Sequence, residues 1–192
     1  MATGPASPDA SVGVTGRRHH VITGASGAGK STLVAALGEL GYATVPEAGL
    51  AVMREQQACG SGILPWTDRA AFMEAVLARS IRDHEAASSL AAPVFFDRAV
   101  TEWLRFLGTD AAPDLVAAAT RCRYAGTVFV AEPWPEIYVR DDERRASFER
   151  AARSYQSTVS AYIDAGYRTC VIPRVPVQER VAFVLARVEP GG

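Results

Sequence analysis

Residues 21–32 read Val-Ile-Thr-Gly-Ala-Ser-Gly-Ala-Gly-Lys-Ser-Thr, and this stretch decides the fold. The run predicts a buried strand, a glycine-rich turn and the start of a helix. Residues 24–31 fit the pattern G-x-x-x-x-G-K-[ST], in which loop amides and a helix N-terminus surround phosphate oxygens. A chance glycine-rich turn is the alternative. The apolar spacing of residues 33–40 favours the motif, because it supplies the helix that a phosphate loop requires.

Individual residues of this loop have predicted roles. Lys30 should reach the β- and γ-phosphates and act in catalysis, and the Ser31 hydroxyl should bind Mg²⁺. Lys30 is the single lysine of a chain with nineteen arginines, which indicates a position where a planar guanidinium would not fit. We therefore expect ATP as the cofactor. The predicted nucleotide-binding residues are Gly24, Ala25, Ser26, Gly27, Ala28, Gly29, Lys30, Ser31 and Thr32.

The composition argues against several classes of function. The chain has 192 residues, of which 48% are hydrophobic and 21% charged, and we expect one domain over residues 17–192 after a disordered tail at 1–16. A net charge of −1 argues against nucleic acid as the main partner. The three cysteines and three histidines show no metal-ligand spacing, and no apolar run is long enough to span a membrane. The protein is predicted to be cytoplasmic, with its oligomeric state open and a homodimer as one option.

Strand-like and helix-like segments alternate along the chain, which predicts parallel strands joined by right-handed crossovers. We expect strands near residues 21–24, 42–45, 93–97, 127–130 and 168–172. The helices are expected at residues 30–40, 48–58, 99–107, 113–121, 142–164 and 177–188, with a further long helix capped by Thr67. His84 falls on the apolar stripe of that long helix and is interpreted as a core histidine with a hydrogen-bond partner.

Two predicted strands end in carboxylates. Asp97 closes the apolar run Val94-Phe95-Phe96, so it should face the phosphate loop and bind the magnesium ion or its water, with helix capping as the alternative. Arg98 could clamp a substrate or a phosphate, or form a surface ion pair. Glu47 follows the second strand, where it could take a proton from an attacking hydroxyl or merely favour the helix dipole.

The acceptor is expected between the second strand and the long helix that follows it. Glu47, Arg54, Trp66 and Arg98 are the predicted substrate-binding residues. Trp66 and Trp134 lie in proline-flanked loops and could stack on a flat substrate, although such aromatic residues are at least as often structural. These residues point to a small hydroxylated molecule.

Residues 133–146 hold Arg140, Arg144 and Arg145 among acidic residues. One interpretation is a solvated helix start with charge pairs along its surface. The other is a lid that closes its arginines over the transferred phosphoryl group and excludes water. We favour the lid, because the segment follows the fourth strand of a phosphate-loop fold, and we count the three arginines as candidate catalytic residues.

Several motifs together resemble the bacterial predicted ATPases of AAA-domain family twenty-eight, which are related to nicotinamide riboside kinase-like domains. The resemblance covers most of residues 18–188. It is carried by Gly24 to Ser31, Val45-Pro46-Glu47-Ala48, Leu64-Pro65-Trp66, Phe95-Phe96-Asp97-Arg98, Arg123-Tyr124, Val128-Phe129-Val130, Pro133-Trp134-Pro135 and Asp142-Glu143-Arg144-Arg145. It implies a P-loop fold of the nucleoside-kinase type, with a five-stranded parallel sheet flanked by helices and a lid. Deoxynucleoside kinases also place a glutamate after strand two and an acid–arginine pair after strand three.

The rival classes fit less well. A Ras-like switch needs an N/T-K-x-D motif, which cannot occur where Lys30 is the only lysine. An AAA+ motor would need a helical domain after the fifth strand, and only one helix is expected there. The leading hypothesis is an ATP- and Mg-dependent kinase acting on a small molecule, plausibly nucleoside-like or a natural product such as an antibiotic. An ATPase or a nucleotide-binding regulatory protein is the alternative.

Overall fold

The computed structural model describes residues 18–107, 112–138 and 147–188. The strands are β1 (His19–Gly24), β2 (Ala43–Val45), β3 (Val94–Asp97), β4 (Thr127–Ala131) and β5 (Arg168–Ile172). The helices are α2 (Lys30–Glu39), α3 (Ala48–Ala58), α4 (Arg69–Ala87), α5 (Val100–Leu107), α6 (Pro113–Arg121), α7 (Phe148–Asp164) and α8 (Val177–Leu185), with a 3-10 turn, η2 (Pro135–Ile137). The expected tail at 1–16 lies outside the described residues.

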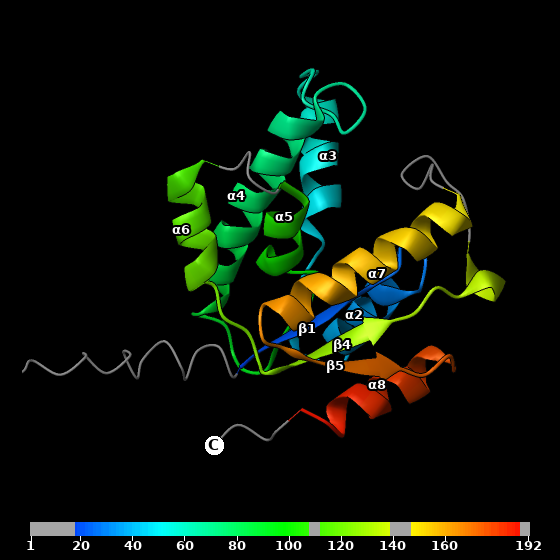
Figure 1. Ribbon diagram of the computed structural model, residues 1–192. Coiled ribbons are helices and arrows are strands. Elements are labelled where there is room, and N and C mark those ends of the chain that lie inside the picture. Colours follow the sequence, from blue (N-terminus) through cyan, green and yellow to red (C-terminus); the bar gives the residue numbers. More distant parts are fainter. Residues whose placement is uncertain (1–17, 108–111, 139–146, 189–192) are drawn as a thin grey trace, which may run out of the picture.

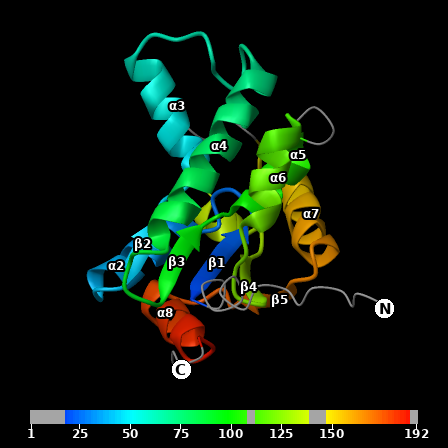
Figure 2. The ribbon, with the colours of Figure 1, turned by 90° about the vertical axis from the view of Figure 1, so that its left-hand side faces the viewer.

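All five strands pair in parallel, in the order β2-β3-β1-β4-β5, which confirms the predicted sheet. Figure 2 shows them side by side, with β2 and β5 at the two edges. Because β1 is central, the turn that follows it opens between the ends of β3 and β4. The carboxyl ends of parallel strands meet at one edge of a sheet, and a ligand site is expected where the strand order reverses.

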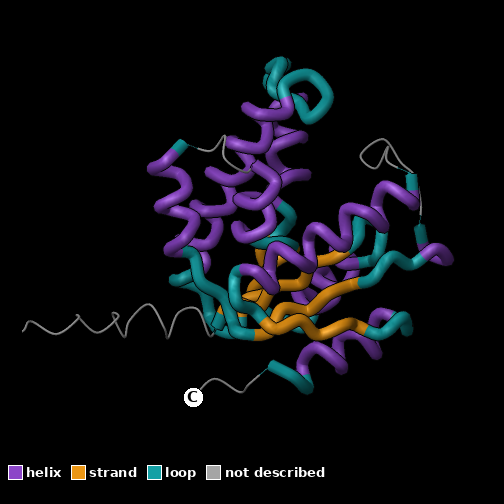
Figure 3. The backbone as a smooth tube through the Cα atoms, viewed as in Figure 1, coloured by secondary structure: helices purple, strands orange, loops and turns teal. Residues whose placement is uncertain are grey.

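Two apolar cores form because neighbouring residues of a buried strand point to opposite faces. Val21 contributes to the core beneath α3, α4, α5, α6 and α7, whereas Ile22 contributes to the core against α2 and α8. Figure 3 shows the strands between these helical layers, and Figure 1 shows α8 on the opposite side of the sheet from α4, α5 and α7. Leu33 and Leu37 of α2 are completely buried, each contributing about 1.5–3 kcal/mol.

Three expected helix boundaries differ from the structure. Asp68, and not Thr67, caps α4, because its carboxylate accepts a hydrogen bond from the backbone N–H of Ala71 at 3.0 Å. Helix α7 begins at Phe148, where the Ser147 hydroxyl caps it, and not near residue 142. Helix α8 ends at Leu185 and not at 188. The hydrogen bonds change there from the α-helical to the 3-10 pattern, because the N–H of Arg187 donates to the carbonyl oxygen of Val184, three residues earlier.

Candidate active site

The predicted phosphate loop lies between β1 and α2. Gly24 has a φ of 123° and sits against the backbone of Ala131 in β4, so close that a Cβ at this position would collide with the carbonyl oxygen. Gly29 precedes α2 in the left-handed region, with a φ of 73°. The glycines therefore permit both the approach of the loop to β4 and the turn into the helix. Positive φ values at glycines are what the predicted phosphate loop requires of its backbone.

Lys30 is buried at the first position of α2, with only 5% of its surface exposed. Its ammonium donates a hydrogen bond to the carbonyl oxygen of Ala25, in the same loop, at 2.7 Å. Burial, assisted by the charge of Arg98, lowers the pKa of Lys30 to about 8, although nearby carboxylates oppose this shift. An anionic phosphate bound at the loop would stabilise the charged ammonium of Lys30 and raise its pKa again.

Ser31 and Asp97 meet across the loop. The Ser31 hydroxyl donates a hydrogen bond of 2.6 Å to Oδ2 of Asp97, whose Oδ1 has no hydrogen-bond partner among the described residues. Burial, followed by the charge of Glu47, raises the pKa of Asp97, while Lys30 lowers it. A hydroxyl oxygen beside a buried carboxylate with one free oxygen fits Mg²⁺, which is usually held by one or two protein oxygens together with phosphates and water.

No group of three or more His, Cys, Asp or Glu side chains within the described ranges could hold a metal by itself. A magnesium ion bound with a nucleotide takes most of its ligands from phosphates and water. Asp97 ends β3, and its neighbour Arg98 hydrogen-bonds through its backbone N–H to the carbonyl of Ile22 in β1 at 3.0 Å. Sheet pairing therefore brings the carboxylate beside the loop.

Arg98 lies between two glutamates. Its Nε is 3.3 Å from Oε1 of Glu47, and its Nη1 is 3.0 Å from Oε2 of Glu102. The Arg98 backbone has a φ of 68°, an unfavourable region for a residue with a Cβ. Burial alone would lower the pKa of this guanidinium, but the Glu102 and Glu47 charges raise it above its usual value. Arg98 therefore forms ion pairs, as one of the two interpretations expected, but they are largely withdrawn from the surface, with 11% of its side chain exposed, and Arg98 does not line the main cavity described below.

A cavity of about 460 Å³ opens over this arrangement. The phosphate loop forms one wall, Glu47 and Leu50 form another, and the segments after β4 and β5 complete it. The lining residues are Ser26, Gly27, Gly29, Lys30, Ser31, Thr32, Glu47, Leu50, Trp134, Ile137, Val175, Pro176, Val177 and Arg180. Ala25 and Ala28 of the predicted nucleotide site are buried behind this surface.

Two buried ionic residues of the site were not predicted. Glu102 in α5 is completely buried, and burial raises its pKa although Arg98 opposes the shift. Arg180 in α8 is 4% exposed and donates to the carbonyl oxygens of Ala28 at 3.2 Å and of Gly29 at 3.4 Å. Its guanidinium carbon is also 5.9 Å from the centre of the Trp134 ring. The spacing of Arg98 and Glu102 was a readable signal, whereas nothing in the sequence linked Arg180 to the loop.

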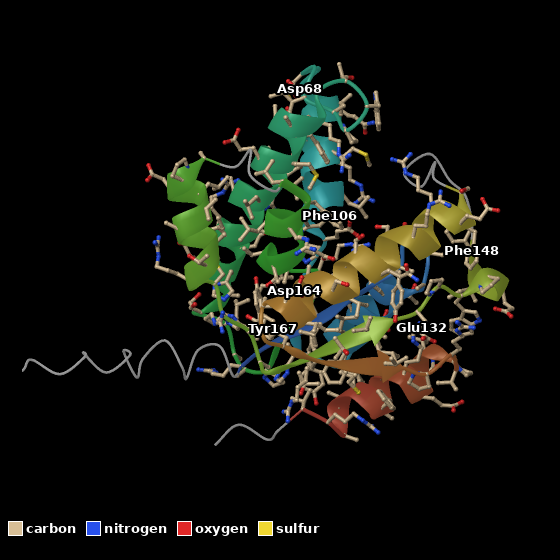
Figure 4. The ribbon with its side chains drawn as sticks, in the orientation of Figure 1. Asp68, Phe106, Glu132, Phe148, Asp164 and Tyr167 are labelled. Carbon is tan, nitrogen blue, oxygen red and sulfur yellow. The ribbon has the colours of Figure 1, made fainter. Side chains whose placement is uncertain are left out.

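Other predicted residues are placed differently. Arg54 and Trp66 do not line the cavity, and Trp66 is 50% exposed in the segment between α3 and α4. Figure 4 shows Asp68, the cap of α4, at the end of this helical pair farthest from the sheet. The three candidate lid residues, Arg140, Arg144 and Arg145, lie outside the described residues. Trp134 does line the cavity, so its loop contributes to the site.

Comparisons with known structures agree with this architecture. The chain is similar to deoxyadenosine kinase from M. mycoides, with a TM-score of 0.59 and 14% identity over 88% of this chain and 97% of that chain. It is also similar to shikimate kinase from Acinetobacter baumannii, with a TM-score of 0.52 and 15% identity over 88% of this chain and 90% of that one. At such identities the likeness shows the fold. No protein of curated function matches the sequence significantly.

The parallel sheet, the phosphate loop after its central strand and the Lys30, Ser31 and Asp97 arrangement define a P-loop enzyme of the kinase or ATPase class. The sequence matches AAA-domain family twenty-eight over residues 19–180. The chain belongs to this family. In residues 18–107, 112–138 and 147–188, no helix has the length and apolar content that a membrane crossing demands.

Proposed function

We propose that the protein transfers the γ-phosphoryl group of Mg-ATP to a hydroxyl of a small molecule. The observation that carries this proposal is the cavity of about 460 Å³ that has Lys30 and Ser31 on one wall and Glu47 on another. A pure nucleotide-binding site needs no carboxylate opposite the phosphates. Phosphoryl transfer uses such a carboxylate, because it can take the proton of the attacking hydroxyl.

The donor would bind with its phosphates against the loop and its base toward Trp134 and Arg180. An aromatic ring and a buried guanidinium offer flat surfaces on which a base can stack. Among the described residues that line the cavity, Glu47 is the only carboxylate, and in this proposal it serves the acceptor.

In the reaction, Lys30 would hold the β- and γ-phosphates. Ser31 and Asp97 would hold Mg²⁺, which supplies positive charge beside the phosphate oxygens. Glu47 would accept the proton of the acceptor hydroxyl while the oxygen of that hydroxyl attacks the γ-phosphorus. The bond from that phosphorus to the bridging oxygen breaks, and ADP leaves with the electron pair. Arg98, paired with Glu47, would fix the orientation of this base.

The acceptor is proposed to be nucleoside-like or a hydroxylated natural product. Deoxyadenosine kinase and shikimate kinase, which share the fold, are named for small acceptors that carry hydroxyl groups. We also infer a cytoplasmic enzyme without a nucleic-acid partner, because all three cysteines are free and the net charge is −1. Fractionation of cells that express a tagged chain would test the location.

An ATPase without an organic acceptor is the second candidate. It is favoured by one observation: the space beside Asp97, Arg98 and Trp103, where an acceptor could extend, is only about 10 Å³. Water would fit there, whereas a nucleoside would require α3 and α5 to move apart. The kinase and the ATPase therefore differ in how much the site must widen during turnover to admit the molecule that attacks ATP.

Mass spectrometry of reaction products separates these candidates. The protein, Mg²⁺ and ATP are incubated with a panel of nucleosides and hydroxylated antibiotics, and each mixture is searched for a mass increase of one phosphate group. Lys30→Ala is the control, since it should produce no such signal. A phosphorylated product supports the kinase, and ATP turnover without any phosphorylated acceptor supports the ATPase. Absence of both nucleotide turnover and product would contradict the enzyme proposal.

A further inference from the structure

Glu102 does not line the cavity, yet it is the most deeply buried ionic side chain near the site, with 0% exposed surface. Its Oε2 accepts two hydrogen bonds. One comes from the hydroxyl of Thr23 in β1 at 3.0 Å, and the other from Nη1 of Arg98 at 3.0 Å. Burying a carboxylate costs several kcal/mol, so this position indicates a specific task for its charge.

The guanidinium of Arg98 is contacted by two carboxylates, by Glu102 through a hydrogen bond and by Glu47 through an ion pair that lacks hydrogen-bond geometry. Glu102 binds Nη1, while Oε1 of Glu47 lies 3.3 Å from Nε. A guanidinium is a planar fork, so fixing one of its nitrogens also sets the direction in which the others point. The orientation of Glu47, which is 19% exposed at the cavity wall, therefore depends on a residue that does not reach the cavity.

Thr23 anchors this chain of contacts to the sheet. It is completely buried in central strand β1 and directly precedes Gly24, the first residue of the phosphate loop. Its hydroxyl fixes Glu102 relative to the strand from which the loop departs. The order Thr23, Glu102, Arg98, Glu47 thus connects the strand that carries the loop with the carboxylate on the opposite wall.

We propose that Glu102 is a positioning residue, which holds Arg98 and through it sets the place of Glu47 opposite the phosphate loop. The consequence for catalysis rests on the proposed function, in which Glu47 takes the proton of the acceptor. The placement of Glu47 by Glu102 does not rest on that function, because it concerns only how the side chains of Glu102, Arg98 and Glu47 are arranged in the free protein. The competing interpretation is that Glu102 only fastens α5 to β1.

The same helix offers a matched control. Arg105 of α5 forms an ion pair of 2.9 Å with Asp164 of α7, with 54% and 58% of the two side chains exposed. This pair also links α5 to another element, but neither residue lines the cavity. Asp164→Asn therefore removes one carboxylate partner of an α5 arginine without touching the site, whereas Glu102→Gln removes a carboxylate partner of Arg98.

The first test observes Arg98 directly. In protein labelled with ¹⁵N-arginine, the Nε–H signal of Arg98 is identified by its loss in Arg98→Lys. We expect Glu102→Gln to shift this signal and to speed its exchange with water, and Asp164→Asn to leave it unchanged. Thr23→Val, which keeps the side-chain size, should produce a smaller shift in the same direction. An Arg98 signal that is unchanged in folded Glu102→Gln, or in Thr23→Val should the former not fold, would overturn the proposal.

The second test asks whether Glu102 acts through Glu47. Unfolding midpoints in urea are measured for Glu102→Gln, Glu47→Gln and the double variant. Since the two glutamates share Arg98, we expect the double variant to lose more than the sum of the single losses. Asp164→Asn combined with Glu47→Gln should be additive. Additive losses for the first pair would mean that Glu102 only fastens the helix.

Rates extend this cycle if the product search finds an acceptor. Glu102→Gln should then slow transfer roughly 10- to 100-fold, as expected for a misplaced catalytic group, and leave the ATP dissociation constant within about twofold. In the Glu47→Gln background the same change should slow transfer less than about twofold, because the misplaced group is already absent. Equal slowing in both backgrounds would overturn the inference. Failure to find any acceptor would instead count against the proposed function, while the Arg98 signal and the urea cycle still decide the role of Glu102.

Discussion

The two edges of the sheet bury titratable side chains in opposite ways. At the carboxyl edge, Lys30 is buried and Arg98 is only 11% exposed, and both lie near the carboxylates of Asp97, Glu47 and Glu102. At the amino edge, uncharged aromatic rings fill the corresponding depth. The two edges have comparable burial, so burial alone does not explain why only one of them retains charges.

The amino edge shows the ordinary solution. His19 and His84 pack edge to face with 4.8 Å between ring centres, and Tyr124 packs edge to face against His84 at 4.9 Å. Burial, assisted by the proximity of His84, lowers the pKa of His19 to about 4. Nε2 of His84 lies 2.9 Å from the carbonyl oxygen of Arg123, which confirms the prediction of a core histidine with a partner. Burial here removes the charge.

At the carboxyl edge Arg98 retains its charge through ion pairs with Glu47 and Glu102, although hydrophobic residues of similar size would often be as stable or more so. Perturbed ionic groups that persist around a cavity indicate a site that uses them. The contrast teaches that opposite charge, and not depth, distinguishes the functional edge.

The largest effect is expected from Lys30→Ala. Loss of the cation that holds the β- and γ-phosphates should abolish measurable ATP turnover and weaken ATP binding. The fold should persist, because burial lowers the pKa of Lys30 and its ammonium is therefore not a stabilising charge. Turnover assays and thermal unfolding would measure both, with exposed Arg105→Ala as the control cation. Turnover at the wild-type rate would refute the role of the loop.

Substitutions of Glu47 and Asp97, two carboxylates at this edge, should affect different activities. Glu47→Gln should slow phosphoryl transfer by about 10² to 10⁴-fold, the usual cost of removing a general base, and spare ATP affinity and slow hydrolysis. Asp97→Asn should impair every Mg-dependent activity, including hydrolysis without an acceptor, because Ser31 and Asp97 would hold the ion. Transfer and hydrolysis rates at several magnesium concentrations measure the difference. If Glu47→Gln suppressed hydrolysis as strongly as transfer, Glu47 would belong with the metal ligands.

The titration of Lys30 offers a sharper measurement. Since Lys30 is the only lysine, protein labelled with ¹³C-lysine gives a single Cε signal, which needs no further assignment. Its pKa should be about 8 in the free protein. Saturating ATP should raise it, because phosphate anions stabilise the ammonium. A pKa near 10.5 without nucleotide would show that the ammonium is solvated, and the contrast between the edges would weaken.

The smallest effect concerns His19 at the amino edge. Its pKa is about 4 in the folded protein and 6.5 in the unfolded chain, so the unfolded state binds more protons between these values. Stability should therefore fall as the pH drops from 6.5 toward 4, by about 2 kcal/mol between pH 7 and pH 5. His19→Phe should remove most of this dependence in urea unfolding. An equal loss in both proteins would assign the acid sensitivity to other groups.

Local sequence patterns were sufficient for much of the fold. The strand, loop and helix of residues 21–32 depend on short-range rules, because glycine permits positive φ and apolar spacing follows the helix or strand period. The same rules predicted the parallel sheet, since each strand is followed by a helix that must pack on it. The errors fell at helix ends such as Thr67, where one residue more or less changes little in the pattern.

The pairing of charges could not be derived in this way. Ser31 and Asp97 were predicted together only because the ends of parallel strands meet at one edge of a sheet. Arg180 reaches the loop from the last helix, 151 positions from Gly29, and no local period encodes that contact. Trp66 shows the opposite error. The sequence predicted that it binds the substrate, but it lies on the segment between α3 and α4 and does not line the cavity.

The sequence by itself therefore determined the fold class, the phosphate loop and the candidate lysine, serine and aspartate, because these depend on backbone conformation and on strand ends. Only the tertiary structure decided that Glu102 is buried, that it shares Arg98 with Glu47, and that α8 contributes Arg180 to the loop. The physical reason is that desolvation and Coulomb attraction depend on distances in space and on burial, which residues far apart in the chain acquire only when the sheet and its helices pack.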